Sequence, residues 1–264
     1  MTPFCSRLHV FYPTHILERD ETGSVHIQVA SPSTLTKSCL SLSRKYDIIY
    51  ENTSDTPILT IDDAPYSEAS FKEILAVLSE HNCTATFFVN SYLITSTNLE
   101  QLLVKAVKQG NHLGNHGEMH RLHIALSDTS LFDEIQNCQV AINRIYQLAN
   151  VERPAVKYYR PTVGLVNGTV DSFAKKFEYR IVLGTNFPGD PRIKIPALND
   201  FYIRRHYAAN DIIILHDRPW TPALLRRLLR TIKTGSLLDY RPRAEDALFQ
   251  PAPNNTPFQG FKSR

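Results

Sequence analysis

The chain has 264 residues, of which 42% are hydrophobic and 21% are charged, and these proportions are typical of a folded globular protein. Its 29 basic and 26 acidic residues give a net charge of +3, which offers little attraction to a phosphate backbone, so we predict no nucleic acid partner. No apolar run reaches the roughly 18 to 20 residues that span a bilayer, so we predict no membrane span.

The N-terminus predicts a cytoplasmic protein. Prolines, arginines and histidines interrupt residues 1–20, which lack the apolar stretch of about 7 to 15 residues found in a signal peptide. A leader removed before maturation stays open as an alternative. The four cysteines are far apart and form no C-x-x-C pair, a pattern that favours buried free thiols over a zinc knuckle or a dense disulfide framework.

From about residue 56, short strand patterns alternate with longer helical patterns, which is typical of βα units around a parallel sheet. The first strand is predicted over residues 57–61. The first helix is predicted over 71–78, where apolar residues recur at i, i+3, i+4 and i+7. A strand over 84–89 and a helix over 99–107 follow, and Gly110 is placed to let the chain leave that helix in a left-handed conformation.

The later elements repeat this scheme. A capping-box-like sequence from Ser130 to Asp133 predicts the start of a long helix. Thr221 and Pro222 predict the N-cap and the first residue of the last helix. The other predicted elements are strands over 112–115, 156–159, 179–183 and 211–215 and a helix over 170–177. Six or seven strands that alternate with helices predict an α/β fold, either a barrel or a doubly wound sheet.

Two flanking segments lack this alternation. Residues 1–50 are predicted to form an N-terminal cap packed on the barrel, and residues 51–240 the barrel itself. Residues 241–264 are rich in proline and polar residues, and they are predicted to form a C-terminal tail.

Residues that bind metals or move protons follow four of the predicted strands. In α/β proteins the functional site lies at the carboxyl ends of the strands, so this placement indicates one shared site. The residues are Asp62 and Asp63 after the first strand, His116 and His120 after the third, Arg160 after the fourth, and His216 with Asp217 after the last.

Asp63, His116 and His120 form a two-histidine, one-carboxylate set that leaves coordination positions for water and substrate, as catalytic metal sites require. Adjacent aspartates at a strand end point in opposite directions, so Asp62 can take another role. Histidines at i and i+4 lie on one face of a helical turn. Taken singly, the aspartates also fit a turn and the histidines a surface pair. Glu118 lies one place too late for the H-E-x-x-H of zinc proteases.

Five ordered segments resemble the motifs of the polysaccharide deacetylase (NodB homology, carbohydrate esterase family 4) superfamily, in its chitin-deacetylase-like branch. They are residues 60–65 (TIDDAP, similar to TFDDGP), His116 with His120 (H-x-x-x-H), residues 160–164 (RPTVG, similar to R-P-x-x-G), residues 182–191 in the place of the fourth motif, and residues 214–217 (ILHD) in the place of the fifth. The resemblance covers about residues 56–235. It implies a distorted (β/α) barrel of about seven strands.

The resemblance also implies hydrolysis of an N-acetyl amide. Asp63, His116 and His120 would hold a divalent metal, with Zn²⁺ as the first candidate and Co²⁺ as the second. Such an ion polarises the acetyl carbonyl and lowers the pKa of bound water. Asp62 would be the general base, and Arg160 would hold it through an ion pair.

Further roles follow from the same resemblance. His216 would protonate the leaving amine, and Asp190 would favour the protonated form of that histidine. The backbone N–H of Val163 would meet the oxyanion, and Leu215 would line the pocket of the acetyl methyl group. Trp220 is interpreted either as a wall of the sugar site or as core. The structural alternatives are a salt bridge for Arg160, a hydrogen-bonded core position for His216 and a turn before Pro191 for Asp190.

Four departures from the family motifs bear on this prediction. Ala64 stands in place of a glycine, which matters if its φ is positive. Gly117 stands in place of a hydroxyl residue whose hydrogen bond steadies the loop, and Val163 in place of a frequent aromatic residue. The fourth motif lacks its usual Asp-x-x-Asp-Trp form, which makes Asp190 the weakest assignment.

The predicted function is a metal-dependent hydrolase that removes N-acetyl groups from N-acetylglucosamine units of a chitin-like polysaccharide or oligosaccharide. Two alternatives remain. One is a hydrolase of a small N-acyl or cyclic amide, and the other is a non-catalytic member that keeps the barrel and binds carbohydrate. The sequence does not specify an oligomeric state. The enzyme is favoured because the chain retains Asp62, Asp63, His116, His120 and His216 together.

Overall fold

The computed structural model describes residues 16–19, 25–28, 46 and 48–240. Strands β1 (Ile16–Arg19) and β2 (Val25–Gln28) pair antiparallel in a two-stranded sheet. Most of the predicted N-terminal cap and all of the predicted C-terminal tail lie outside the described residues.

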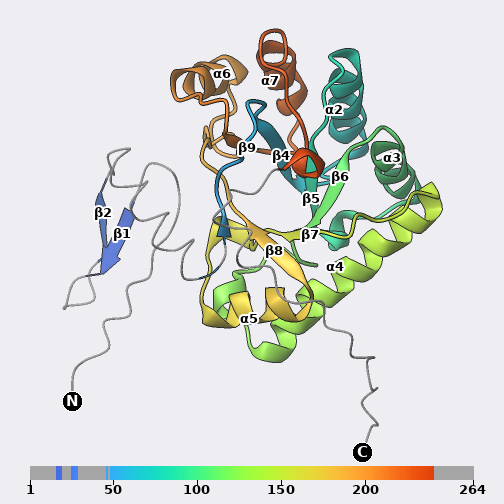
Figure 1. Ribbon diagram of the computed structural model, residues 1–264, viewed down its shortest axis with the longest axis vertical. Helices are drawn as coiled ribbons and strands as arrows, with labels where there is room; N and C mark the ends of the chain where they lie inside the picture. Colours follow the sequence, from blue (N-terminus) through green and yellow to red (C-terminus); the bar gives the residue numbers. More distant parts are fainter. Residues whose placement is uncertain (1–15, 20–24, 29–45, 47, 241–264) are drawn as a thin grey trace, which may run out of the picture.

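The centre of the fold is a parallel sheet of seven strands in the order β3-β8-β7-β6-β5-β4-β9 (Figure 1). An isolated bridge pairs Glu51, just after β3, with Asp211, just before β9, so the two edges of the sheet approach each other. The sheet therefore curls into the predicted distorted barrel. The strands are β3 (Ile48–Ile49), β4 (Ile58–Ala64), β5 (Thr86–Val89), β6 (His112–Asn115), β7 (Lys157–Tyr159), β8 (Tyr179–Val182) and β9 (Ile212–His216).

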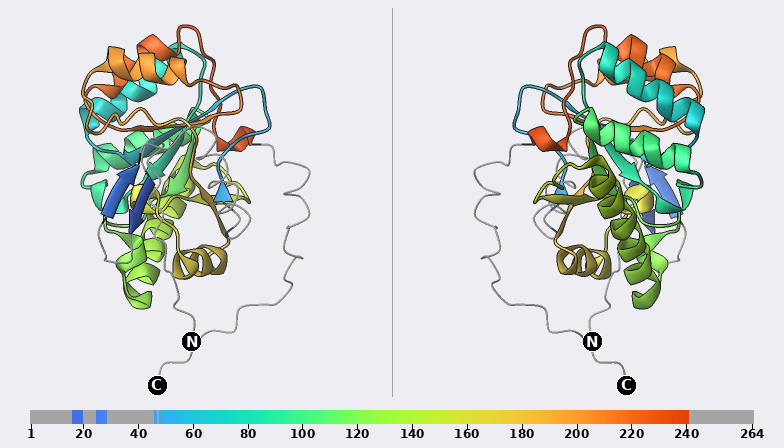
Figure 2. Two further views of the ribbon diagram at one scale, coloured as in Figure 1. Left: turned by 90° about the vertical axis from the view of Figure 1, so that its left-hand side faces the viewer. Right: turned by 90° about the vertical axis from the view of Figure 1, so that its right-hand side faces the viewer.

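Strand β3 was not predicted, and it moves the start of the barrel to Ile48, just before the predicted boundary at residue 51. Helices cover the outside of the sheet. In the side views, α2, α6 and α7 gather at one end of the molecule and α4 and α5 at the other (Figure 2). The helices are α2 (Glu68–Glu80), α3 (Thr97–Lys108), α4 (Asp128–Ala149), α5 (Gly168–Lys176), α6 (Pro196–Arg205) and α7 (Thr221–Leu228).

Side chains alternate across each strand, so the sheet packs on two layers. On β4, Leu59 and Ile61 point outward and join a cluster with residues of α2, α3 and α7. Ile58 belongs to a separate cluster with Phe88 and Tyr158. Because this second cluster draws residues from strands at both edges of the sheet, it fills the interior of the barrel.

Two predicted helix starts are displaced, by three residues for α4 and by one residue for α7. Helix α4 begins earlier than Ser130, because the Ser127 side chain accepts a hydrogen bond from the Ser130 N–H and acts as the N-cap. Helix α7 has Trp220 at its N-cap position. The Thr221 hydroxyl, predicted as that cap, instead donates to the His216 carbonyl at 2.6 Å.

Helix α6 was not predicted from the sequence, because it lacks an apolar face at helical spacing. Its buried residues are Asn199, Asp200 and Ile203, while Leu198 and Phe201 are exposed. The Arg204 guanidinium bonds to Asp200 on the same helix at 2.9 Å and also donates to the Arg227 carbonyl of α7 at 2.8 Å. Polar side chains thus fasten this helix where apolar ones fasten the others.

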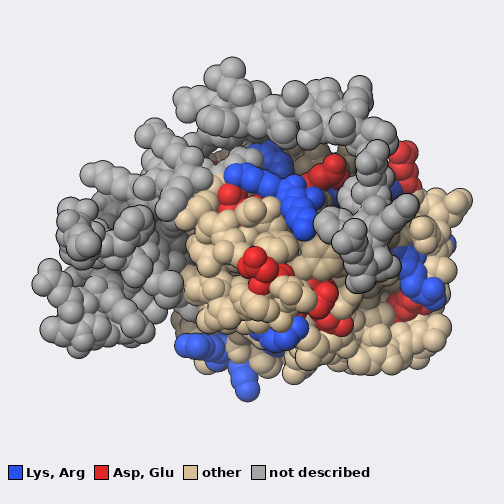
Figure 3. Space-filling view, turned by 90° about the horizontal axis from the view of Figure 1, so that it is seen from below, with Lys and Arg blue, Asp and Glu red and all other residues tan. Residues whose placement is uncertain are grey.

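The described surface carries both signs of charge. Acidic and basic side chains are interspersed over the described part of the face in Figure 3, which fits the near balance of charge in the sequence. Within the described ranges, no helix has both the length and the apolar character needed to cross a membrane.

Candidate active site

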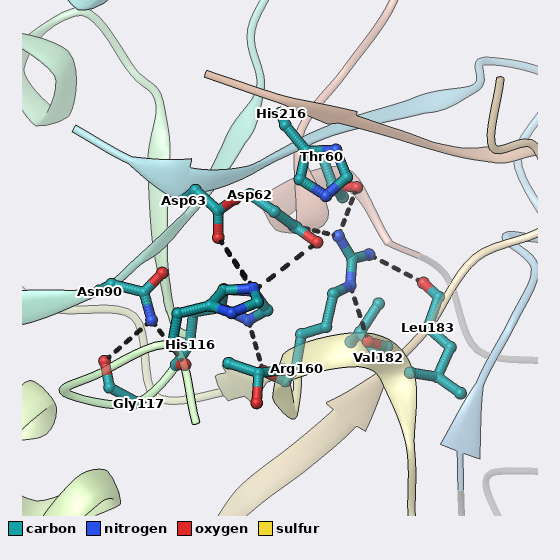
Figure 4. Close-up of polar contacts among 12 residues, drawn as sticks. Thr60, Asp62, Asp63, Asn90, His116, Gly117, Arg160, Val182, Leu183 and His216 are labelled. Carbon is teal, nitrogen blue, oxygen red and sulfur yellow. Dashed lines mark hydrogen bonds and ion pairs between the residues drawn. The ribbon is translucent and has the colours of Figure 1, made fainter. Parts of the chain in front are cut away.

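The carboxyl ends of β4, β6, β7 and β9 meet at one end of the barrel. The sheet register places Asp62 on β4 beside His216 on β9, and Asn115 at the end of β6 beside Tyr159 at the end of β7. The structure therefore gathers seven of the predicted site residues: Asp62, Asp63, His116, His120, Arg160, Asp190 and His216 (Figure 4 shows the central ones).

Both aspartates face this site, which corrects the prediction that they point in opposite directions. The register of β4 against β5 shifts between Ile61 and Ala64, and Asp63 has φ 57, in the left-handed region. As a result, His116 Nε2 lies 4.0 Å from Asp62 Oδ2 and 3.6 Å from Asp63 Oδ1. Ala64 does not have a positive φ, so alanine is accommodated in place of glycine.

His116 and His120 come from a loop, not from one face of a helical turn, because residues 116–122 form no helix. Gly117, at φ 87, turns the chain just after β6. His120 Nε2 thereby lies 3.7 Å from Asp63 Oδ1. The His116 side chain is 3% exposed and that of His120 is 46% exposed, so one imidazole is enclosed and the other reaches in from the surface.

The Asp63 carboxylate is the centre of a candidate metal site. One nitrogen from each of His116 and His120 and one Asp63 oxygen all lie within 4.8 Å of one another. Asp63 Oδ1 is buried and has no hydrogen-bond partner among the residues that the structure describes. A buried carboxylate oxygen without a partner costs free energy, and a divalent cation would satisfy it. A donor set of two nitrogens and one oxygen fits Zn²⁺.

The protonation states also suit a cation. Burial raises the pKa of Asp63, but the protonated forms of His116 and His216 and the Arg218 guanidinium outweigh burial and lower it to about 2. Burial lowers the pKa of His116 in spite of the nearby carboxylates. Its Nδ1 lies 2.6 Å from the Arg160 carbonyl, to which an Nδ1–H donates. The Nε2 lone pair then faces Asp63, as in histidines that bind metals.

Arg160 fixes the carboxylate of Asp62. Its Nη1 donates to Asp62 Oδ1 at 2.5 Å and to Thr60 Oγ1 at 2.8 Å. Its Nε and Nη2 donate to the carbonyls of Val182 and Leu183 at 3.1 and 2.9 Å (Figure 4). Because the planar guanidinium is bound on all sides, the orientation of the Asp62 carboxylate is set by the barrel.

Asp190 holds His216 at two points. The His216 backbone N–H donates to Asp190 Oδ2 at 2.8 Å, and His216 Nδ1 lies 3.1 Å from Asp190 Oδ1. Burial lowers the pKa of His216, but the charge and hydrogen bond of Asp190 outweigh burial, so the pKa lies above its usual value. Asp190 is itself fully buried, and the Trp220 indole N–H donates to its backbone carbonyl at 3.0 Å.

The residues predicted to contact the substrate differ in their exposure. Leu215 is fully buried in the cluster between the sheet and the helices, so it offers no surface to a substrate, which corrects that prediction. Because side chains alternate along a strand, its neighbour Ile214 shares the face of His216, and Ile214 is partly exposed. Val163 lies on the loop after β7 with φ 64 and is 36% exposed.

Arg218 was missed by the sequence reasoning. Its Nη2 donates to Asp63 Oδ2 at 2.5 Å and its Nη1 to the Asp217 carbonyl at 2.7 Å, and its guanidinium lies 4.7 Å from the centre of the Tyr66 ring. Arg218 thus binds Asp63 Oδ2, whereas the two histidines face Asp63 Oδ1. The available signal was its position directly after the segment Ile-Leu-His-Asp.

Gly117 has no hydroxyl group, so other hydrogen bonds hold the loop that carries the two histidines. The Gly117 N–H donates to Asn115 Oδ1 at 2.8 Å, and Asn90 Nδ2 donates to the His116 carbonyl at 2.9 Å. A Cβ at position 117 would lie 2.7 Å from His123 Nε2. Hydrogen bonds of side-chain amides therefore take the place of those of the hydroxyl group. Glycine is required at position 117, because a Cβ there would collide with His123.

Replacing Gly117 by serine, the residue type of the family motif, should lower the free energy of unfolding by about 1–3 kcal/mol, because the position combines a positive φ with no room for a side chain. Urea denaturation measures this change. Gly168→Ala is the matched control, since nothing lies within 4 Å of a Cβ there. Equal stability of Gly117→Ser and wild type would contradict the prediction.

The comparison with known proteins identifies the family. A family model described as polysaccharide deacetylase matches residues 50–182. The chain belongs to the polysaccharide deacetylase family. A curated relative, the peptidoglycan-N-acetylglucosamine deacetylase of Bacillus cereus, is 26% identical in an alignment of 182 residues that covers 66% of this chain and 80% of the relative. A peptidoglycan-N-acetylmuramic acid deacetylase of Bacillus subtilis is 28% identical over 144 residues, which are 54% of this chain and 52% of that protein.

Solved structures of the family share the fold. The chain matches a peptidoglycan N-acetylglucosamine deacetylase in complex with 4-naphthalen-1-yl-N-oxidanyl-benzamide at a TM-score of 0.67 and 19% identity, over 76% of this chain and 95% of that one. It matches a CE4 family pseudoenzyme from Bacillus anthracis at a TM-score of 0.63 and 20% identity, over 73% of this chain and 68% of that one. The same barrel thus occurs in a deacetylase and in a pseudoenzyme.

Proposed function

We propose that this chain is a metal-dependent hydrolase that removes the N-acetyl group from N-acetylglucosamine units of a polysaccharide or oligosaccharide. The observation that carries the proposal is the unpartnered Asp63 Oδ1, which faces His116 Nε2 and His120 Nε2 at 3.6 and 3.7 Å. A base candidate held by an arginine and an acid candidate held by a carboxylate lie beside this cluster.

Each residue of the site has a separate role in the proposed reaction. When bound, a divalent ion, Zn²⁺ or Co²⁺, polarises the acetyl carbonyl and lowers the pKa of water. The Asp62 carboxylate, held by Arg160, accepts a proton from the attacking water. The Val163 N–H donates to the oxyanion that forms on the carbonyl. His216 Nδ1 is engaged by Asp190, so Nε2 is the atom that donates a proton to the leaving amine.

The substrate class rests on the family. The curated relatives named above are deacetylases of N-acetylglucosamine and N-acetylmuramic acid in peptidoglycan. We propose chitin-like oligomers as the first substrate to test and peptidoglycan fragments as the second, because both carry N-acetylated glucosamine. Acetate released from each by the metal-loaded protein decides between them.

Removal of a metal ligand should weaken metal binding strongly. Wild-type protein loaded with Zn²⁺ should retain about one ion per chain, whereas Asp63→Ala and His120→Ala should retain much less. Metal analysis after dialysis measures this. His206→Ala removes an exposed histidine at the end of α6 and should bind as wild type does. Unchanged metal content in both ligand variants would overturn the assignment of the site.

A second candidate is a non-catalytic member of the family that binds carbohydrate. The similarity to a pseudoenzyme and the altered second and fourth motifs favour it. The two functions separate cleanly in one experiment. Metal-loaded wild type that binds the oligomers in calorimetry without releasing acetate supports the non-catalytic candidate, and acetate release supports the hydrolase.

A further inference from the structure

A charged side chain that the proposed chemistry does not use lies behind the loop of His116 and His120. Glu134, on α4, has no exposed surface. The helix buries it alongside apolar residues such as Leu131, Ile135 and Cys138. Burial of a carboxylate is costly unless hydrogen bonds and an opposite charge compensate it, so the partners of Glu134 indicate why it is there.

The partners of Glu134 lie on either side of His120 in the chain. The Met119 backbone N–H donates to Glu134 Oε2 at 2.7 Å, and Arg121 Nε donates to Glu134 Oε1 at 2.5 Å. Arg121 is also held by its carbonyl, which accepts a hydrogen bond from the Thr162 hydroxyl. One buried carboxylate therefore fastens the two residues that flank His120.

His120 has no such fastening of its own. The ring of its neighbour His116 is fixed through Nδ1 by the Arg160 carbonyl at 2.6 Å. Within the part of the chain that the structure describes, the His120 ring makes no hydrogen bond, and its side chain is 46% exposed. The direction of its Nε2 toward Asp63 thus depends on how the backbone on both sides is held.

We propose that Glu134 is the positioning residue of the metal site, and that it sets the place of His120 by anchoring Met119 and Arg121. This inference rests on the proposed function, since it assumes that His120 binds the metal. Other side chains pack around the Glu134 carboxylate. His123 Nε2 lies 3.9 Å from Glu134 Oε2, and His123 Nδ1 lies 2.5 Å from the Tyr159 hydroxyl.

The test is metal affinity, measured without substrate by competition with a coloured chelator. Glu134→Gln keeps the size of the side chain and removes the charge that binds Arg121. We expect the Kd for Zn²⁺ to rise about 10- to 100-fold, the usual effect of losing a group that orients a ligand. Glu118→Gln is the matched control. Glu118 is in the same loop, but among the described residues its carboxylate bonds only the exposed Asn137 amide, at 2.9 Å, so the Kd should stay within about twofold.

A positioning role also makes a prediction about activity. If the loss is in metal affinity, kcat of Glu134→Gln should recover toward wild type as Zn²⁺ is raised to saturation, which a general loss of packing would not allow. Should Glu134→Gln fail to fold, Arg121→Gln removes the same ion pair from a half-exposed side chain. We expect it to raise the Kd about two- to fivefold.

The outcomes distinguish the two proposals. Wild type that binds no Zn²⁺ overturns the proposed function. Wild type that binds Zn²⁺, with an unchanged Kd in whichever of Glu134→Gln and Arg121→Gln folds, leaves the proposed function standing and overturns the role of Glu134. A Kd that rises equally in Glu118→Gln also overturns it, because the effect would then belong to the loop in general.

Discussion

Replacement of Asp62 by asparagine should reduce acetate release by a factor of about 10² or more and leave the metal content unchanged. The factor is the usual worth of a positioned general base. Asparagine has the shape of aspartate, and its amide oxygen can still accept from Arg160, but it cannot take a proton from water. Metal content should stay the same because the cluster of ligand atoms consists of Asp63, His116 and His120 without Asp62.

The measurement is kcat/KM for acetate release together with metal analysis of the same sample. Asp133→Asn makes the same chemical change at an exposed position on α4 and should keep full activity. The result can be interpreted only if Asp62→Asn folds. Arg160 is 2% exposed, and the substitution removes the charge of its buried partner. A folded, metal-loaded Asp62→Asn protein with wild-type activity would move the base to another group.

Replacement of His216 by alanine should also remove most of the activity, by a factor of about 10² or more, without releasing the metal. The alanine removes the group that protonates the leaving amine. His216 does not belong to the cluster of candidate ligand atoms in the described residues. If Zn²⁺ leaves the protein in His216→Ala, this histidine is a ligand and the assignment of an acid is wrong.

The partner of His216 fixes the direction of a pH effect. Only the protonated imidazole donates, so activity falls on the alkaline side as His216 loses its proton. Asp190 raises the pKa of His216 against the effect of burial. Asp190→Asn removes the negative charge, so the pKa of His216 should fall and the alkaline limb of the kcat/KM profile should move to lower pH. A limb that stays or moves upward would show that Asp190 only shapes the turn before Pro191.

Much of the site could be predicted because its residues follow strands in a fixed order. Four strand ends carried acidic, basic or imidazole side chains, and a parallel sheet brings such ends to one edge. This argument located Asp62, Asp63, His116, Arg160 and His216 correctly at one end of the barrel. It also failed in definite ways, since it placed the two histidines on a helical turn and the two aspartates on opposite sides.

Those failures have one cause, which is backbone that departs from regular structure. Asp63 and Gly117 both have positive φ values, and the alternation rules for helices and strands do not apply across such residues. The assignment of Leu215 to the substrate pocket failed for a different reason. There the strand is regular, and the face of each side chain follows from the pairing of Asp62 with His216.

The sequence by itself determined the α/β class, the order of the strands and helices that it predicted, the family and the chemical types gathered at the strand ends. These properties depend on local spacing and on short motifs, which are readable along the chain. The tertiary structure alone decided the partners that are distant in sequence. Arg218 reaches Asp63 across 155 positions, and Glu134 reaches the loop of His120 from helix α4. Such contacts depend on how the barrel closes and where each buried charge finds its counter-charge, and neither is encoded in local spacing.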